Sequence, residues 1–415
     1  MSTQRPPLLT LDDALQRLLF AAQPVGQREE VSTFDADGRV LMQDVVSGLQ
    51  VPPQDNSSMD GYALARASVP SAGTVVAVTQ RIAAGSSGQA LQAGEAARIF
   101  TGAPIPPGAD AVVMQEDCEV VAEAIDGKPG QVRVQAVPTP GQWIRRAGED
   151  VTLGSVVLGR GMRLSPASLG MAAAVGLREL QVAPRPRVAL FSTGDELVMP
   201  GDVAPADMRP GAIYNSNRFF LRAMLLRLGC VVTDLGIVPD QRDATVQALR
   251  DAAQHHDLIL TSGGVSVGEE DHIRPAVESL GSLDLWQIAI KPGKPFAYGR
   301  IGAAHFIGLP GNPVSSFVTF AVLVRPFLLS LQGAAEVAPV TVSARADFDW
   351  PRADKRREFL RVRRNTQGGL DLFSNQSSGV LTSAVWGDGL VDNPAGQTVR
   401  RGDTVRFIAL SDLLS

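Results

Sequence analysis

The stretch Leu258-Ile259-Leu260-Thr261-Ser262-Gly263-Gly264-Val265-Ser266-Val267-Gly268 joins a short apolar run to a loop of glycines and serines. The apolar run is typical of a buried strand. Glycine permits positive φ, so the backbone N–H groups of such a loop can converge on an oxyanion. Three acidic residues, Glu269 to Asp271, follow at once. Carboxylates suit a phosphate only when a cation lies between them, so the stretch predicts a site for a phosphorylated ligand and a divalent metal ion.

This loop by itself leaves two interpretations open. It is neither a Walker A sequence nor the Gly-x-Gly-x-x-Gly dinucleotide fingerprint. A strand that ends in a sharp turn also needs glycine, simply for its backbone geometry. The rest of the chain therefore has to decide between a ligand site and a structural turn.

Composition narrows the class of protein. The chain has 415 residues, of which 45% are hydrophobic and 20% charged, as in globular proteins with two to four domains. A net charge of −5 argues against a general nucleic-acid binder. The two cysteines, Cys118 and Cys230, are too few for a disulfide framework or a four-thiolate zinc site, which fits a reducing cytoplasm.

The sequence also predicts a cytoplasmic protein without a membrane span. The first 28 residues lack the charged-then-apolar pattern of a signal peptide, and we expect no apolar stretch of 18 residues. The most apolar run, Phe317 to Leu329, contains Arg325 and Pro326 and is predicted to be a buried helix.

The middle of the chain alternates predicted strands with predicted helices. Strands are expected at 188–191, 231–237, 258–261 and 303–309, and helices at 217–228, 242–255 and 313–329. Another helix is expected at 11–22, with Thr10 as its cap. This alternation predicts a doubly wound, mostly parallel α/β sheet, in which ligands bind outside the carboxyl ends of the strands.

The regions before and after this α/β segment are predicted to be β-structure. Short apolar runs separated by turn residues occur at 75–78, 111–114, 120–122 and 132–134, and again at 340–344, 359–362, 369–373 and 404–409. These patterns predict a small all-β domain before the α/β region and a terminal β-domain after it.

Four polar or glycine-rich segments of the α/β region follow strands or stiff turns. They are Ser192–Leu197, Ser262–Gly268 (the Ser262 loop), Lys291–Pro295 and Gly308–Ser316. If the strands are parallel, these segments converge on one rim and form a pocket for an anionic ligand. The alternatives remain that the acidic residues only favour a helix start and that the two lysines are solvated surface charges.

Three further segments lie outside the α/β region. They are Asp55–Ala63, Thr101–Asp110 and Arg145–Asp150. Their short polar side chains, prolines and paired charges also suit a capped turn, a stiff loop and a solvated charge cluster.

The seven segments occur in the order seen in the molybdopterin molybdenumtransferases, a family that includes the C-terminal domain of gephyrin. The chain resembles this family from about residue 8 to residue 410. The Ser262 loop also occurs in related molybdenum-cofactor adenylyltransferases. The segments before residue 151 and the terminal β-domain distinguish the chain from those relatives.

The resemblance implies a reaction in which adenylyl-molybdopterin and molybdate give molybdenum cofactor and AMP, assisted by Mg²⁺. It implies an elongated homodimer in which the segment near Asp60 faces the α/β domain of the other subunit. Expected partners are a molybdopterin adenylyltransferase and molybdoenzyme maturation proteins. The implied domains are α/β (1–26 with 183–331), linking and dimerisation (27–50 with 140–182), β-rich lid (51–139) and C-terminal β-barrel-like (335–415).

The resemblance and the chemistry of oxyanions together give the candidate site residues. Lysines, hydroxyls and backbone amides suit phosphate and molybdate, and Mg²⁺ takes oxygen ligands. Expected to bind substrate are Thr101, Ser192, Thr193, Gly194, Ser262, Gly263, Gly264, Ser266, Lys291, Lys294, Pro310, Asn312, Ser315, Arg361 and Ser378. Expected catalytic residues are Asp271, Asp60, Glu196 and Asp150, and expected metal ligands are Asp271, Asp240 and Glu196.

Two other functions stay open. An adenylyltransferase or nucleotide hydrolase could share the Ser262 loop, and would turn over nucleotide without molybdate. A non-enzymatic scaffold is also compatible with the gephyrin resemblance, although no long low-complexity linker occurs in the chain.

Overall fold

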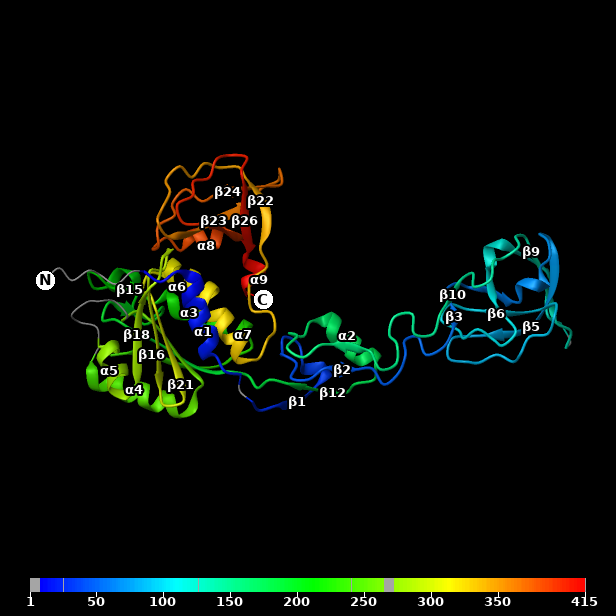
Figure 1. Cartoon of the computed structure of the whole chain (residues 1–415), viewed down its shortest axis with the longest axis horizontal. Coiled ribbons are helices and arrows are strands. Elements are labelled where there is room, and N and C mark those ends of the chain that lie inside the picture. The colour runs from blue at the N-terminus through cyan, green and yellow to red at the C-terminus, as the bar shows by residue number, and fades with distance from the viewer. Residues whose placement is uncertain (1–7, 25, 126, 240, 265–271, 415) are drawn as a thin grey trace.

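The computed structural model describes residues 8–24, 26–125, 127–239, 241–264 and 272–414. The molecule is elongated (Figure 1). An α/β domain and a C-terminal β-domain lie together at one end, a small β-domain lies at the other, and a narrow linking region joins them.

The α/β domain is built on a six-stranded sheet with the order β16-β13-β17-β21-β20-β18. The first four strands are parallel, and β20 is antiparallel to both of its neighbours, β21 and β18. The strands are β13 (Arg187–Thr193), β16 (Val231–Val238), β17 (Leu258–Ser262), β18 (Ser282–Gln287), β20 (Pro295–Ile301) and β21 (Ala304–Leu309). The prediction of a mostly parallel, doubly wound sheet is confirmed, whereas β18 and β20 were not predicted.

Helices cover both faces of this sheet. Alternate side chains of β13 enter two different cores: Val188 and Leu190 pack on one side, and Ala189 and Phe191 on the other. The first core includes α1 (Leu11–Ala21) and α3 (Ser216–Arg227), and the second includes α4 (Arg242–His255) and α5 (Ile273–Leu280). Thr10 caps α1 as expected, because its side chain accepts a hydrogen bond from the backbone N–H of Asp13.

The buried helix predicted at 313–329 is present but is not uniform. It consists of α6 (Pro313–Thr319), a π-helical segment (Phe320–Val324) and α7 (Arg325–Leu331). Pro326 has no N–H and cannot continue an ordinary α-helical ladder, and the π-helical turns lie directly before it. The stretch Pro313–Leu331 is apolar enough to span a membrane, with a mean hydropathy of 1.8, so the expectation of no such window was wrong. Its most apolar window is 94% buried, which confirms a core helix.

The C-terminal domain is a closed five-stranded barrel. Its strands are β22 (Val342–Ala346), β23 (Arg357–Arg364), β24 (Gly369–Leu372), β25 (Gly389–Asn393) and β26 (Thr404–Ala409). They pair in the order β23-β24-β22-β26-β25, and pairing of β23 with β25 closes the ring. The short helices α8 (Thr382–Trp386) and α9 (Leu410–Leu414) accompany them. The predicted fold class, α/β with β-rich domains and a barrel-like end, is confirmed.

The remaining elements form the linking region and the distal β-domain. The linking region contains β1 (Glu29–Ser32), β2 (Val45–Val46), β11 (Val156–Leu158), α2 (Pro166–Ala174) and β12 (Glu179–Val182). The distal sheet contains β4 (Gly61–Leu64), β5 (Thr74–Ile82), β6 (Glu95–Ile99), β7 (Ala111–Met114), β8 (Cys118–Ala122) and β9 (Gly130–Val134). Beside it, β3 (Asn56–Ser57) pairs with β10 (Ile144–Arg145).

The α/β domain and the barrel are joined by a strand pair and by a buried carboxylate. The strand β19 (Ile290–Lys291) runs parallel to β23. The Nζ of Lys291 lies 2.9 Å from Oε1 of Glu358 and 3.4 Å from Oδ2 of Asp354. The side chain of Glu358 is only 1% exposed, and its Oε2 accepts a 2.8 Å hydrogen bond from Nε1 of Trp350. A buried carboxylate with several donors fixes the orientation of the two domains.

We expect Glu358→Gln to weaken this junction. The neutral amide loses the ion pair with Lys291 and cannot accept hydrogen bonds at both of its polar atoms. The unfolding free energy of the barrel should fall by about 1–3 kcal/mol, measured by chemical denaturation. Glu278→Gln is the control, because Glu278 forms an exposed pair with Arg274 on one helix and should matter little. Equal stability of the two variants would contradict this role of Glu358.

Candidate active site

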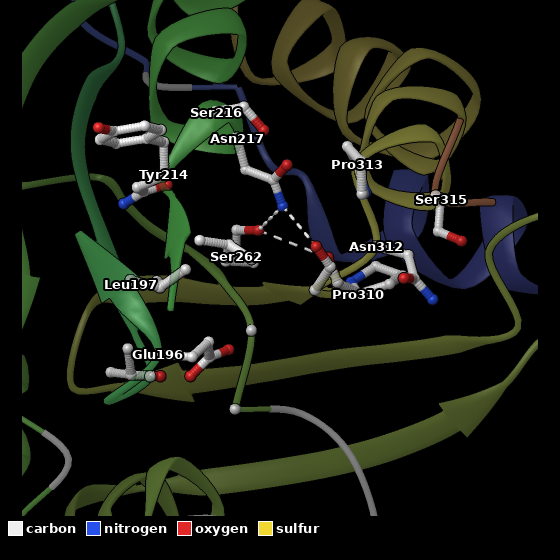
Figure 2. Close-up of a pocket in the computed structure, with 18 of the residues that line it drawn as sticks. Glu196, Leu197, Tyr214, Ser216, Asn217, Ser262, Pro310, Asn312, Pro313 and Ser315 are labelled. Atoms are coloured by element: carbon white, nitrogen blue, oxygen red, sulfur yellow. Dashed lines mark hydrogen bonds between the residues drawn. The ribbon is translucent and has the colours of Figure 1, made fainter. Parts of the chain in front are cut away.

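A pocket of about 830 Å³ opens at the carboxyl ends of β13, β17 and β21 (Figure 2). In the parallel register Ser192 lies level with Ser262, and Ser262 lies level with Leu309, so the loops after the three strands start side by side. The described lining residues are Thr193, Gly194, Glu196, Leu197, Ile213, Tyr214, Asn215, Ser216, Asn217, Ser262, Gly263, Gly264, Pro295, Pro310, Gly311, Asn312, Pro313, Ser315 and Gly379. The volume is within the usual range of small-molecule sites.

The Ser262 loop needs its glycines. Gly263 and Gly264 have φ of +92° and +65°. A Cβ on Gly264 would lie 2.7 Å from Oγ1 of Thr193 and 2.7 Å from Cγ1 of Ile273. The loop is therefore pressed against the end of β13, and a larger residue at position 264 would displace the loop or its neighbours.

Two short segments form the wall opposite the strand ends. The small parallel pair of β14 (Leu197–Val198) and β15 (Ile213–Tyr214) leads into α3. Asn215 caps this helix by accepting a hydrogen bond from the N–H of Arg218. Asn217 lies two residues further along the chain and points at Ser262 and the Pro310 loop (Figure 2). Sequence reasoning missed these asparagines, although the polar triplet Asn215-Ser216-Asn217 at a helix start was a usable signal.

The lining combines polar groups with apolar side chains and carries no positive side chain among the described residues. Hydroxyls come from Thr193, Ser216, Ser262 and Ser315, and the carboxylate comes from Glu196. The Glu196 carboxylate lies over Gly194, in the space that a Cβ there would fill. Such a site offers hydrogen-bond donors to an anion and an oxygen ligand to a cation.

Eight of the expected substrate-binding residues line the pocket: Thr193, Gly194, Ser262, Gly263, Gly264, Pro310, Asn312 and Ser315. Glu196, an expected catalytic residue and metal ligand, lines it as well. Ser192 lies just behind it with its side chain buried. Lys291 and Lys294 are not among the described lining residues. The Lys291 ammonium is held by Glu358 and Asp354, so it does not face the pocket as an unpaired charge.

Arg361 and Ser378 belong to the barrel beside the pocket. Ser378 contacts the start of α6 through its carbonyl, which accepts a 2.9 Å hydrogen bond from the N–H of Val314. The guanidinium of Arg361 is buried and donates to Oγ of Ser383 and the carbonyl of Phe359. Burial lowers the pKa of Arg361 to about 10.

Asp60, Thr101 and Asp150 lie far from the pocket of their own chain, in and beside the distal β-domain (Figure 1). Oδ1 of Asp60 accepts two 2.8 Å hydrogen bonds, from the backbone N–H and the hydroxyl of Thr101. These hydrogen bonds lower the pKa of Asp60. Asp150 lines a separate pocket with Glu149 and Arg145.

The acidic residues expected to hold a metal ion are mostly outside the described part of the chain. Ser266, Asp240 and Asp271 all lie outside the described residues. Within the residues that the structure describes, no group of three or more His, Cys, Asp or Glu side chains could hold a metal ion. Glu196 is the described member of the expected metal set.

Comparison with known proteins identifies the family. Residues 9–176 match the MoeA N-terminal region (domain I and II), 189–330 a probable molybdopterin binding domain, and 343–410 the MoeA C-terminal region (domain IV). A molybdopterin molybdenumtransferase of Haemophilus influenzae is 39% identical over 88% of this chain and 89% of its own. The chain belongs to the molybdopterin molybdenumtransferase family.

Other relatives agree with this assignment. Molybdopterin molybdenumtransferase 2 of Mycobacterium tuberculosis is 37% identical over 91% of this chain and 92% of its own. A crystal structure of the molybdopterin biosynthesis moeA protein from Pyrococcus horikoshii superposes with a TM-score of 0.83, at 28% identity, and covers 97% of this chain and 100% of that one. The prediction of an enzyme of the molybdopterin molybdenumtransferase family is confirmed.

We expect Gly264→Ala to destabilise the protein more than a glycine substitution without a steric conflict. Gly73 is the matched control: its φ is +84°, but nothing lies within 4 Å of a Cβ there. Both variants strain the backbone, and only Gly264→Ala also collides with Thr193 and Ile273. The extra loss of unfolding free energy should be about 1–3 kcal/mol in denaturant titrations. Equal losses would show that the loop is not pressed against β13.

We expect Thr101→Val to raise the pKa of Asp60 while leaving it below its ordinary value. The substitution removes the hydroxyl donor but keeps the backbone N–H donor, which is the larger cause of the lowered pKa. Carboxyl NMR titration of Asp60 in the two proteins measures the difference. An unchanged titration would mean that the hydroxyl does not bind the carboxylate in solution.

Proposed function

We propose that the protein inserts molybdenum into molybdopterin, so that adenylyl-molybdopterin and molybdate give molybdenum cofactor and AMP. The observation that carries this proposal is the polar, glycine-lined pocket at the ends of β13, β17 and β21, in a chain that belongs to the molybdopterin molybdenumtransferase family. Hydroxyls and backbone amides of this pocket suit the phosphate groups that join the pterin to adenosine.

The charge of the lining supports a divalent ion as a participant. Two joined phosphates are anionic, yet the described lining residues include the Glu196 carboxylate and no cation. A carboxylate of this kind fits the oxygen-rich coordination of Mg²⁺, with Asp240 and Asp271 as the further proposed ligands. Mg²⁺ would supply Lewis-acid stabilisation of the phosphate charge as AMP leaves. Thr193, Ser262 and the Gly263–Gly264 backbone would hold the phosphates beside it.

For molybdate we propose the side of the pocket where α6 meets the barrel. Ser315 lines the pocket there. The loop that carries Lys291 and Lys294 packs against α6 at Gly293, where an added Cβ would lie 3.5 Å from the carbonyl oxygen of Ser315. Arg361 and Ser378 stand behind this point in the barrel. Binding of molybdate would require Lys291 to exchange part of its pairing with Glu358 and Asp354 for the oxyanion.

We further propose that the enzyme is a cytoplasmic homodimer, joined through the linking domain (27–50 with 140–182), with a lid domain (51–139) that serves the other subunit. The linking region exposes large apolar side chains, among them Phe34, which is 96% exposed. Such groups favour a protein interface. The long distance between Asp60 and the pocket of its own chain (Figure 1) fits a contribution from Asp60, Thr101 and Asp150 to the partner's site. A molybdopterin adenylyltransferase and molybdoenzyme maturation proteins are the proposed partners in solution.

The direct test is molybdate-dependent release of AMP. Purified protein is incubated with adenylyl-molybdopterin and Mg²⁺, with or without molybdate, and AMP is measured. We expect molybdate to accelerate release, and Asp271→Asn and Glu196→Gln to slow it at least about tenfold, as expected when a group that stabilises the transition state is lost. Glu278→Gln, which alters an exposed carboxylate outside the pocket lining, should leave the rate unchanged.

Two results would contradict the proposal. AMP release that is independent of molybdate would favour the nucleotide hydrolase or adenylyltransferase interpretation. Binding of adenylyl-molybdopterin without any turnover would favour a carrier or scaffold.

A further inference from the structure

We propose that Asn217 is a positioning residue: it holds two pocket loops, 262–264 and 310–313, at the spacing that the phosphate groups of the substrate require. This inference rests on the proposed function, because it concerns how the same pocket is shaped. Asn217 lies at the start of α3, a third element that faces both loops (Figure 2).

The contacts of Asn217 are short and directed at both loops. Its side chain is 8% exposed. Nδ2 donates one hydrogen bond of 2.7 Å to Oγ of Ser262 and another of 2.7 Å to the carbonyl of Gly311. A side-chain amide nitrogen has two N–H groups, and here each of them reaches a different loop.

One of the two acceptors, Oγ of Ser262, belongs to a buried polar network. Oγ of Ser262 lies 3.3 Å from Oγ of Ser316 and 3.4 Å from the carbonyl of Pro310. Oγ of Ser316 donates a 2.6 Å hydrogen bond to that same carbonyl. Because Ser262 and Ser316 are shielded from water, loss of the Asn217 donor would leave Oγ of Ser262 without its N–H donor, which costs more than the loss of an exposed hydrogen bond.

The two loops touch directly at the point that Asn217 bridges. The N–H of Gly263 donates a 3.1 Å hydrogen bond to the carbonyl of Leu309, and a Cβ on Gly311 would lie 3.9 Å from Cα of Gly263. Both loops also line the pocket. A small shift of one loop against the other would therefore move the donors on two sides of the ligand, and ligand affinity depends strongly on such placement.

Gln332, the C-cap of α7, offers a matched control because it contacts the other end of α3. It is 4% exposed, and its Nε2 donates to the carbonyls of Leu228 and Leu328 at 3.3 and 3.2 Å. Leu228 is the C-cap of α3. Gln332 is thus a buried amide that joins the end of α7 to the end of α3 through two carbonyl acceptors, and it is not among the described lining residues.

The test compares Asn217→Leu, Asn217→Asp and Gln332→Leu with the unmodified protein. Affinity for AMP is measured by calorimetry in the presence of Mg²⁺, and hydrogen exchange is measured for peptides that cover 258–264 and 306–313. We expect Asn217→Leu to weaken AMP binding about tenfold and to speed exchange in both peptides. Gln332→Leu should lower global stability to a similar degree while leaving AMP affinity within about twofold.

Asn217→Asp adds a second measurement, the pH dependence of AMP affinity, which a merely structural role would leave unchanged. An ionised aspartate donates no hydrogen bond, whereas its protonated form donates one. Its AMP affinity, taken relative to the unmodified protein at each pH, should therefore recover in part as the pH falls. This variant keeps the shape of asparagine and decides the question if Asn217→Leu does not fold.

The inference is overturned if Asn217→Asp binds AMP as well as the unmodified protein at every pH, or if exchange in the two peptides is unchanged. If the unmodified protein does not bind AMP, the proposed function fails, and the exchange comparison still decides whether Asn217 holds the loops.

Discussion

The parallel register of β13, β17 and β21 is the constraint on which the site depends. Hydrogen bonds between these strands set Ser192 level with Ser262, and Ser262 level with Leu309. The three strands therefore end level with one another, and the loops that follow them, from distant parts of the sequence, meet at one edge of the sheet. The sheet is held by cores on both faces, which makes this edge a rigid base for a ligand site.

The loops at this edge then depend on close backbone contact. Gly263 and Gly264 let the first loop lie against β13, and Asn217 joins that loop to the Pro310–Pro313 turn. The resulting pocket has many donors and no described side-chain cation. The expected cations lie elsewhere: Lys291 is paired with Glu358 and Asp354 at the junction with the barrel, and Arg361 is buried in the barrel.

Much of the α/β domain could be predicted from local pattern. The helix Arg242–His255 and the strand Thr404–Ala409 were predicted at their observed bounds, because apolar spacing and turn residues mark both ends. The short alternating strand β18 was missed, although Ser282 to Gln287 does carry alternating apolar residues.

The surroundings of the candidate residues were harder to predict than the residues themselves. The sequence Lys291-Pro292-Gly293-Lys294-Pro295 resembles an anion loop, but the partner of Lys291 is a carboxylate 67 residues further along the chain. That ion pair forms only when the barrel packs against the α/β domain, so no local sequence pattern predicts it. The separation of Asp60 from the pocket likewise follows from the linking region and not from the motif around Asp60. Asn217 acts through two distant loops, and its neighbours in sequence show only a helix cap.

The most direct test of the central claim is a crystal structure of the protein with AMP and Mg²⁺. We predict that the AMP phosphate lies at the ends of β13 and β17, within hydrogen-bonding distance of Thr193 or the Gly263–Gly264 backbone. AMP bound at another place, with this pocket holding only solvent, would contradict the account.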